Sequence, residues 1–294
     1  MIAARHAPVL GKIAPSGTIA ARILAGGEGW YVEDVLCTSG PRDRPFEEQH
    51  PDVSISVVAS GTFQYRSAAG EHLLTPGSLL LGNAGECYEC GHEHGSGDRC
   101  VAFHYTAEMF EELARDAGAT PRTARFRVAR MPPLRELAPL VARCWSGLEG
   151  ASALAWEELG LVLGARALKL AVGLTPPGRS PPRHVVARVT DAVRRIERHP
   201  GARHALAELA REAQLSPYHF LRTFERLTGV TPHQFLLRAR LREAARRLTT
   251  SRRRVIDVAL DAGFSDVSNF NRAFRAEFGV APMTYRASGM GIGD

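Results

Sequence analysis

The stretch LAREAQLSPYHFLRTFERLTGVTPHQF (Leu209 to Phe235) returns later in the chain as VALDAGFSDVSNFNRAFRAEFGVAPMTYR (Val258 to Arg286). The residues that recur at a shift of 50 positions are Phe220/Phe270, Phe224/Phe274, Gly229/Gly279, Val230/Val280 and Pro232/Pro282. Upstream the shift is 49, as for Ser216 and Ser265, so one residue is inserted at the turn. Each copy has the pattern of a short helix, a tight turn and a second helix. The pattern predicts a doubled helix-turn-helix.

Positive charge is concentrated in the segment that carries this repeat. Residues 183–294 contain 20 Arg, no Lys and 11 Asp or Glu, a net charge of +9, whereas the first 182 residues have a net charge of −3. A basic surface that also carries helix-turn-helix patterns is typical of contact with DNA phosphates. A merely solvated basic face is the alternative.

The length and the cysteine usage limit the class of protein. A chain of 294 residues is long enough for two domains, each with its own core. The first 24 residues do not form a signal peptide, because Arg22 ends the apolar run, and no apolar run reaches the length of a membrane span. Five cysteines without an export signal favour reduced thiols in a cytoplasmic protein.

The N-terminal half has the pattern of a small β-structure. Val53, Ile55 and Val57 alternate with small or polar residues, Gly61 marks a turn, and further short strands follow up to residue 81. The spacing predicts a small β-barrel or sandwich. A strand is also expected at 125–128 and a helix over 105–117. Two further helices are expected over 134–148 and 153–172, packed on the barrel or against a second subunit.

A proline-rich run divides the chain in two. Residues 173–182 hold four prolines among Gly, Ser and Arg, a composition that suits an extended linker. The predicted fold is therefore α+β. It has an N-terminal domain over 1–172, a linker over 173–183 and an all-α domain over 184–289.

The helical domain is predicted element by element. Helices are expected at 185–198 and 206–213, a first recognition helix with Ser216 as N-cap and Pro217 at its first position, a connecting helix over 234–248, a short helix over 255–261, and a second recognition helix capped by Ser265 or Asp266. The phenylalanine stripes face inward. The side chains left outside are Tyr218, His219, Arg222 and Arg226 in the first helix and Ser268, Asn269, Asn271, Arg272 and Arg275 in the second.

These motifs resemble a known family. The second copy, from Gly263-Phe264-Ser265-Asp266 to Tyr285-Arg286, and the first, from Ser216-Pro217 to Pro232, are similar to the C-terminal signature of AraC/XylS-type transcription regulators over residues 185–287. The region around 45–105 resembles the cupin-type sensor domain of such regulators. The resemblance implies two recognition helices in adjacent major grooves. It makes Tyr218, Leu221 and Arg222, with Ser268, Asn269, Asn271 and Arg272, the candidates that read bases.

The resemblance also bears on partners. It implies promoter DNA as the main partner and an N-terminal half that senses an effector or dimerises. RNA polymerase and a second copy of the chain are further candidate partners, and transcriptional activation is one expected outcome of binding. Leu221 departs from the pattern of polar base contacts, since it can touch a thymine methyl group but cannot donate a hydrogen bond.

One segment, from Glu86 to His104, is rich in cysteine and histidine. Its turn composition at 95–98 predicts a hairpin on which the donors meet on one face if the register allows. The candidate ligands are Cys87, Cys90, His92, His94, Cys100 and His104. Thiolate and imidazole favour zinc or another thiophilic ion. Thiol-based sensing and purely structural roles are the alternatives, and Tyr88 stands where a cupin metal histidine is expected. Cys37 and Cys144 are expected to be ordinary buried residues.

The leading hypothesis is a sequence-specific, DNA-binding transcription regulator with no enzymatic activity. Two alternatives compete with it: a cupin-type metalloenzyme or DNA-repair protein that carries a DNA-binding domain, and a non-specific architectural DNA binder. No hydrolytic constellation, nucleotide-binding glycine loop or Pro-Cys-His nucleophile motif supports an enzyme.

Overall fold

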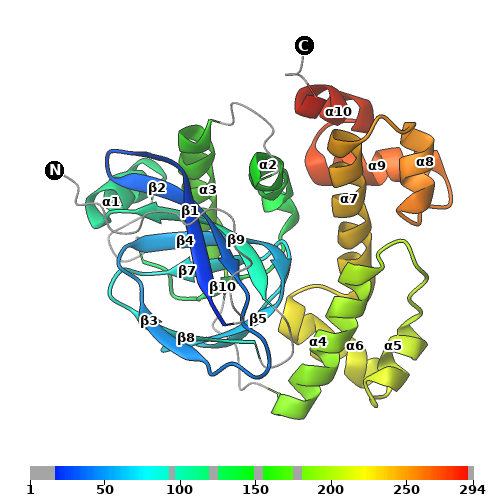
Figure 1. Cartoon of the computed structure of the whole chain (residues 1–294), viewed down its shortest axis with the longest axis horizontal. Coiled ribbons are helices and arrows are strands. Elements are labelled where there is room, and N and C mark those ends of the chain that lie inside the picture. The colour runs from blue at the N-terminus through cyan, green and yellow to red at the C-terminus, as the bar shows by residue number, and fades with distance from the viewer. Residues whose placement is uncertain (1–16, 93–96, 119–124, 149–154, 175–180, 291–294) are drawn as a thin grey trace.

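The computed structural model describes residues 17–92, 97–118, 125–148, 155–174 and 181–290 (Figure 1). Two β-sheets and four helical segments form the N-terminal domain, and a helical domain follows. The larger sheet has the order β1 (Ile19–Gly27), β2 (Trp30–Cys37), β9 (Asp98–Tyr105), β4 (Val53–Gly61), β7 (Leu79–Gly82) and β10 (Arg130–Met131). The smaller sheet has the order β3 (Phe46–Gln49), β8 (Cys87–Gly91), β5 (Phe63–Ser67) and β6 (Gly70–Leu74).

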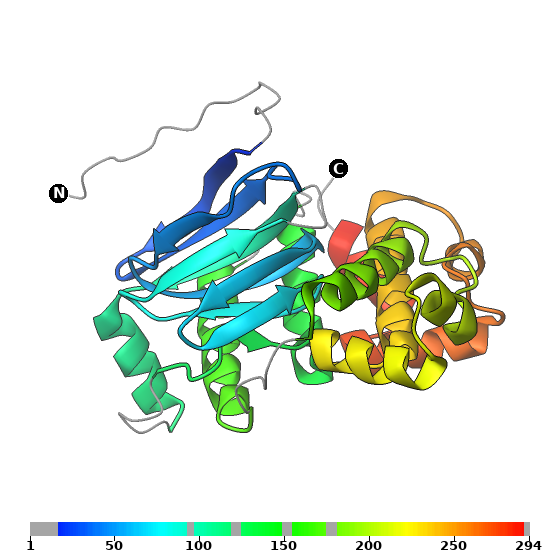
Figure 2. The same ribbon diagram turned by 90° about the horizontal axis from the view of Figure 1, so that it is seen from below.

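The alternating side chains of β4 show that the larger sheet lies between a layer of helices and the smaller sheet. Ile55 and Val57 are fully buried in a cluster with residues of the helices, while Val58 is buried in a second cluster with Phe63 and Cys90 of the smaller sheet. Neighbouring side chains of a strand point to opposite faces. One face of the larger sheet therefore carries helices and the other meets the smaller sheet, as Figure 2 shows for the two sheets.

The helices of the N-terminal domain pack on the sheet. They are α1 (Ala107–Asp116), the 3₁₀ turn η1 (Arg135–Leu137), α2 (Ala138–Leu148) and α3 (Trp156–Ala171). Leu159, Leu163 and Ala167 of α3 are fully buried against the sheet, so packing on the barrel accounts for the apolar stripe of this helix.

The prediction of a strand at residues 125–128 is wrong. Asn83 replaces the pairing of a strand there: its Oδ1 accepts from the backbone N–H of Phe126 at 2.9 Å, and its Nδ2 donates to the Phe126 carbonyl at 2.9 Å. Regular pairing begins only at β10, where Arg130 and Met131 face Leu80 and Leu79.

The helical domain consists of seven helices in the described residues. They are α4 (Arg183–Arg198), α5 (Leu206–Glu212), α6 (Pro217–Thr228), α7 (Pro232–Thr250), α8 (Val255–Asp261), α9 (Val267–Phe278) and α10 (Pro282–Met290). The predicted helices are all found, and α7 is about 28 Å long at 1.5 Å per residue. Most of the predicted linker, residues 175–180, lies outside the described residues.

The two helix-turn-helix units are built on two separate cores. Phe220, Phe224 and Phe235 belong to a cluster that includes α4, whereas Phe270 and Phe274 belong to another that includes Ala142 of α2. Helix α7 contributes to both clusters. The shared helix therefore connects the two units rigidly.

Candidate DNA interface and candidate metal site

The first recognition helix, α6, begins as predicted. Ser216 has extended backbone angles and its Oγ accepts from the backbone N–H of His219 at 3.3 Å, with Pro217 at the first helical position. Burial of Phe220 and Phe224 turns the opposite face to solvent. There the Tyr218 side chain is 62% exposed, and its hydroxyl accepts from Nη1 of Arg222 at 3.1 Å.

The second recognition helix, α9, repeats this arrangement with different side chains. Asp266 is the N-cap, and its Oδ1 accepts from the backbone N–H of Asn269 at 2.6 Å. The equivalent of Ser216 is thus Asp266, and the inserted residue of the repeat is Ser265. On the exposed face, Arg272 donates to Oδ1 of Asn269 at 3.2 Å. Each helix therefore holds an exposed arginine against a side chain one turn earlier.

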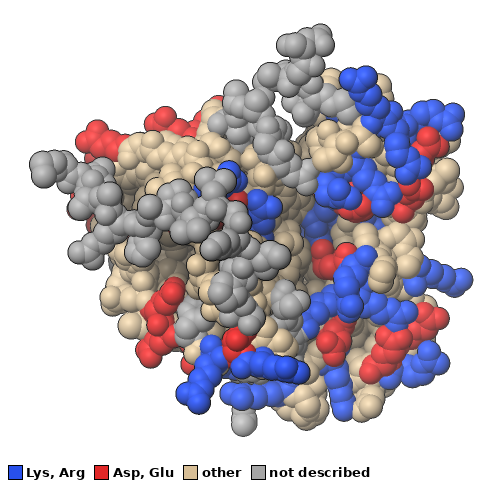
Figure 3. Space-filling view, in the orientation of Figure 1, with Lys and Arg blue, Asp and Glu red and all other residues tan. Residues whose placement is uncertain are grey.

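Nine of the ten predicted DNA-binding residues are exposed, and Leu221 is half-buried. The exposed ones are Tyr218, His219, Arg222, Arg226, Ser268, Asn269, Asn271, Arg272 and Arg275. Figure 3 shows many basic side chains over the helical domain, all of which are arginines. Base contacts require an exposed helix face with polar side chains, and both helices offer one.

A groove of about 820 Å³ lies beside α9. Its arginine rim is formed by Arg252, Arg254, Arg272, Arg275 and Arg286, and Val255, Ile256 and Met283 lie among its apolar lining. Two arginines of the run at 252–254 already have acidic partners, since Arg253 pairs with Asp261 and Arg254 with Asp257 at 3.0 Å. These pairs offset the unfavourable effect of positive charge at the N-terminus of α8.

A segment of the N-terminal domain holds the C-terminal ends of both recognition helices. Nη1 of Arg130 donates to the Leu227 carbonyl at the end of α6 at 2.8 Å. Nε of Arg135 donates to the Ala276 carbonyl near the end of α9 at 3.0 Å. The last carbonyls of a helix lack partners inside the helix. Residues 130–135, named here the bridging segment, therefore connect the N-terminal domain to both helices.

The predicted Cys/His hairpin is not formed. Strand β8 pairs with β3 and β5 in the smaller sheet, whereas β9 pairs with β2 and β4 in the larger one. The two strands are adjacent in sequence, but the chain passes from one sheet to the other between them. The predicted hairpin, on which the donors could meet across neighbouring strands, is therefore wrong.

The described members of the predicted ligand set are spread along both strands. Cys87 is exposed, Cys90 and Cys100 are buried between the sheets, and His104 stacks on Tyr31 at a ring distance of 4.4 Å. His94 lies outside the described residues. Burial lowers the pKa of His104 to about 4, so this side chain is neutral at pH 7.

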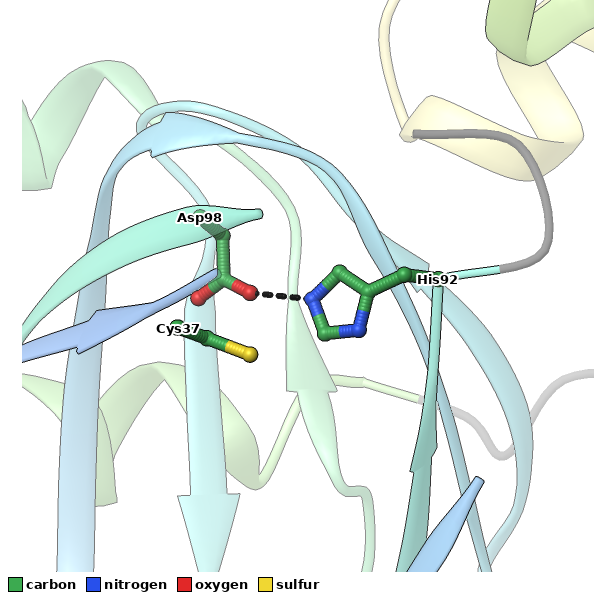
Figure 4. Close-up of side chains that lie close together, drawn as sticks. All are labelled: Cys37, His92 and Asp98. Atoms are coloured by element: carbon green, nitrogen blue, oxygen red, sulfur yellow. Dashed lines mark hydrogen bonds and ion pairs between the residues drawn. The ribbon is translucent and has the colours of Figure 1, made fainter. Parts of the chain in front are cut away.

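The remaining histidine, His92, meets two residues from other strands. Its Nε2 lies 2.6 Å from Oδ1 of Asp98, and the ligand atoms of Cys37, His92 and Asp98 all lie within 4.8 Å of one another (Figure 4). All three residues are buried. This triad can hold a metal ion. Sequence reasoning missed Cys37, which is 55 positions before His92; only the pairing of β2 with β9, which sets Cys37 opposite Asp98, reveals it.

Two residues of the triad, Cys37 and His92, favour their charged forms. Burial raises the pKa of the Cys37 thiol, but hydrogen bonds from His92 and Ser39 outweigh this effect and hold it below the usual range. Burial lowers the pKa of His92, and hydrogen bonds with Asp98 and Cys37 reverse this and raise it to about 9. In contrast, burial raises the pKa of the thiols of Cys90 and Cys100. The surroundings of Cys37 therefore favour the thiolate, whereas those of Cys90 and Cys100 favour the thiol.

Comparisons with known proteins match both halves. A family described as the AraC-like ligand binding domain matches residues 36–163, and one described as a helix-turn-helix domain matches residues 209–288. The HTH-type transcriptional activator AarP of Providencia stuartii is 32% identical over 90 residues, which cover 31% of this chain and 67% of AarP. The chain belongs to the AraC family of transcription regulators. The prediction of a DNA-binding regulator is confirmed, and the enzyme alternatives are not supported.

Two further relatives each match about a third of this chain. The transcriptional activator NphR of Rhodococcus sp is 42% identical over 91 residues, which cover 30% of this chain and 26% of NphR. LumQ of Photobacterium leiognathi is 36% identical over 91 residues, 31% of this chain and 37% of LumQ. The chain thus spans about a third of the length of these two relatives.

Solved structures add two likenesses. The DNA-binding domain of AdpA, in complex with a target DNA, is 33% identical and covers 34% of this chain and 91% of that one, with a TM-score of 0.33. ToxT from Vibrio cholerae is 11% identical and covers 92% of this chain and 99% of that one, with a TM-score of 0.36. In the described part of this chain, no helix has the length and apolar character needed to span a bilayer.

Proposed function

We propose that α6 and α9 read two sites on promoter DNA through the ten residues predicted from the sequence. The observation that carries the proposal is the equivalence of Arg222 and Arg272, both exposed, at the same position after the N-cap of each helix. Arginine makes bidentate contacts with guanine in the major groove. Each helix therefore carries one arginine suited to read a base.

The two helices are suited to different base edges. Asn269 and Asn271 of α9 carry amides that can pair with adenine, whereas the equivalent positions of α6 hold His219 and Leu221. Leu221 is half-buried, so it contributes at most an apolar contact to a thymine methyl group. We expect α9 to impose the stricter base preference.

The basic groove beside α9 is suited to the DNA backbone. Arg252 and Arg275 lie on its rim and are exposed, and neither forms an ion pair among the described residues. Contacts of this kind position the protein and make its affinity depend on salt. They add affinity without sequence preference.

The N-terminal domain is proposed to tune these helices through the bridging segment. Its effector is proposed to be a thiophilic metal ion or a thiol-reactive compound, because the domain contains buried cysteines and one thiol with a lowered pKa. A second copy of the chain and RNA polymerase remain proposed partners. Movement of Arg130 or Arg135 would release the helix end that each one holds.

Selection from a random duplex pool followed by fluorescence anisotropy tests the DNA-binding proposal. The full chain is expected to enrich one site and to bind it about 10³-fold or more tightly than unrelated duplex. Affinity should fall steeply as salt rises. Equal affinity for all duplexes would favour an architectural role instead and would overturn the proposal.

A further inference from the structure

We propose that Cys37, His92, Asp98 and Cys100 bind one thiophilic divalent cation of the Zn²⁺ type, and that its binding is transmitted to the DNA-binding domain through Thr62 and Arg194. The transmission part rests on the proposed function, whereas the site itself does not. The ligand set differs from the one that the sequence predicts, because it includes Cys37 and excludes Cys87 and His104.

Three secondary-structure elements bring the first three ligands together. Cys37 ends β2 and Asp98 begins β9, and the register pairs them directly. Directly opposite residues of antiparallel strands have Cβ atoms about 4.5–5.5 Å apart. His92 follows β8 and comes from the other sheet. The ligands thus close the end of the barrel where the two sheets meet, as the inward-pointing side chains in Figure 4 show.

Cys100 is suited to be the fourth ligand. It lies two residues after Asp98 on β9, so both side chains point to the same face, and its Sγ lies 3.4 Å from Oδ2 of Asp98. A tetrahedral Zn²⁺ site takes four ligands with Zn–S distances of about 2.3 Å and Zn–N distances of about 2.0 Å. The ligand atoms of Cys37, His92 and Asp98 already lie within 4.8 Å of one another, and the thiol of Cys100 would turn from its contact with Asp98 to complete the set.

The surroundings of the site favour a bound ion. The side chains of His92 and Asp98 are only 2% and 8% exposed. The ring of His92 turns Nε2, the nitrogen that pairs with Asp98, toward the other ligands (Figure 4). Two thiols, an imidazole and a carboxylate suit a thiophilic ion better than Mg²⁺ or Ca²⁺.

The backbone around the ligands is fixed by two glycines with positive φ. A Cβ on Gly97 would lie 2.3 Å from the Cys37 carbonyl oxygen, and one on Gly61 would lie 2.6 Å from Cα of Asp98. Only glycine permits this close approach. Cys37 and Asp98 are therefore held in place before any ion binds.

The site is connected to α4 of the DNA-binding domain. Thr62 follows Gly61 and is buried, and its Oγ1 accepts from Nε and Nη2 of Arg194, both at 3.2 Å. His92, Thr62 and Arg194 line one small cavity of about 10 Å³. If His92 shifts toward an ion, the cavity that it shares with Thr62 and Arg194 changes shape. Arg194 belongs to α4, the helix that packs on α6, so the shift can reach the DNA-binding domain through one contact. The backbone of Gly61 provides a second connection, since it lies against Asp98.

Cobalt binding to the reduced, anaerobic full chain tests the site. We expect one equivalent of Co²⁺, with thiolate charge-transfer bands and the visible bands of tetrahedral cobalt, displaced by Zn²⁺. Cys37→Ser and His92→Ala should each weaken binding by at least about 10–100-fold. Cys87→Ser and Cys144→Ser are the matched controls and should bind as the parent does. Equal binding by Cys37→Ser, or a spectrum without thiolate bands, would overturn the site.

DNA anisotropy with and without Zn²⁺ tests the transmission. We expect Zn²⁺ to change DNA affinity about fivefold or more, as is typical of coupled sites. Thr62→Val should keep Co²⁺ binding and lose this change, because it removes the acceptor of Arg194 with little change of volume. Metal binding with unchanged DNA affinity would overturn the transmission alone. Normal metal binding by a chain that binds no DNA site would instead contradict the proposed function.

Discussion

The two helix-turn-helix units share their local construction and differ in their surroundings. Both recognition helices start with a polar N-cap and end at a left-handed glycine, Gly229 or Gly279. In the first unit, Gln214 takes a φ of 53° in the turn, where the second has Gly263 at 89°. The same motif thus tolerates different turn residues. The caps and the aromatic stripe define the unit more strictly than its turn does.

The tertiary neighbours of the two units also differ. A Cβ on Gly229 would lie 2.2 Å from Cβ of Pro132 in the bridging segment, whereas a Cβ on Gly279 would have no heavy atom within 4 Å. At this point the first unit therefore packs against the N-terminal domain, whereas the equivalent point of the second unit has no neighbour within 4 Å. Substitutions at equivalent positions of the two units therefore measure how much these neighbours contribute to stability.

Phe224→Ala and Phe274→Ala should have the largest effects. Each ring is fully buried, and its removal should cost about 3–5 kcal/mol of the free energy of unfolding. We expect the greater loss for Phe274, which contacts Phe270, Phe278 and Tyr285, whereas Phe224 contacts Phe220 and Phe235. Urea unfolding measures both. The exposed control Arg226→Ala should cost less than about 0.5 kcal/mol. A loss of that size for either phenylalanine would contradict the buried stripe.

Gly229→Ala and Gly279→Ala should have the next largest effects on stability, and the two losses should differ. Both substitutions place a Cβ in a left-handed conformation, which costs about 1–2 kcal/mol. Gly229→Ala must also displace Pro132, and overpacking of this kind adds about 1–3 kcal/mol. Thermal unfolding of the full chain measures the difference. Equal losses would show that the bridging segment does not press on α6 in solution.

Arg222→Ala and Arg272→Ala should each weaken DNA binding by about 1–3 kcal/mol and relax the preference at one base pair. Competition binding with single-base variants of the selected site measures both effects. Because the two residues lie on different helices, the base pairs that respond should differ. If both substitutions relaxed the same base pair, the assignment of one site to each helix would be wrong.

The smallest expected effects concern the N-caps. Ser216→Ala and Asp266→Ala should each cost about 1 kcal/mol of stability, because each removes the acceptor of a backbone N–H in the first turn. Ser265→Ala is the control and should cost less than about 0.5 kcal/mol, since this residue is the insertion and is exposed. A larger loss for Ser265 than for Asp266 would move the cap by one residue.

The helical domain followed closely from local sequence. Ser216 and Pro217 mark a helix start through their own backbone chemistry, and the bounds of α8 agree with the prediction of residues 255–261. Amphipathic spacing identified the buried phenylalanines because each helix repeats every 3.6 residues whatever its neighbours are. The same spacing places the DNA-binding candidates on the opposite, exposed face of each helix. Which bases they contact stays a prediction.

The Cys/His site did not follow from local sequence. Alternation correctly indicated that Cys100 and His104 share a face, but it does not state which strand lies alongside. The turn composition at 95–98 predicts a hairpin, but the flanking strands β8 and β9 belong to different sheets. Cys37 was set aside as an isolated residue for the same reason.

The sequence by itself determined the doubled helix-turn-helix, its caps and buried stripes, the basic surface and the α+β class, because these depend on interactions between residues close in the chain. Only the tertiary structure decided that Cys37 meets His92 and Asp98, and that Arg130 and Arg135 reach the ends of both recognition helices. These contacts join residues 55 to 141 positions apart, so they depend on sheet order and domain packing. Those are set by the burial of the whole chain, which no local pattern records.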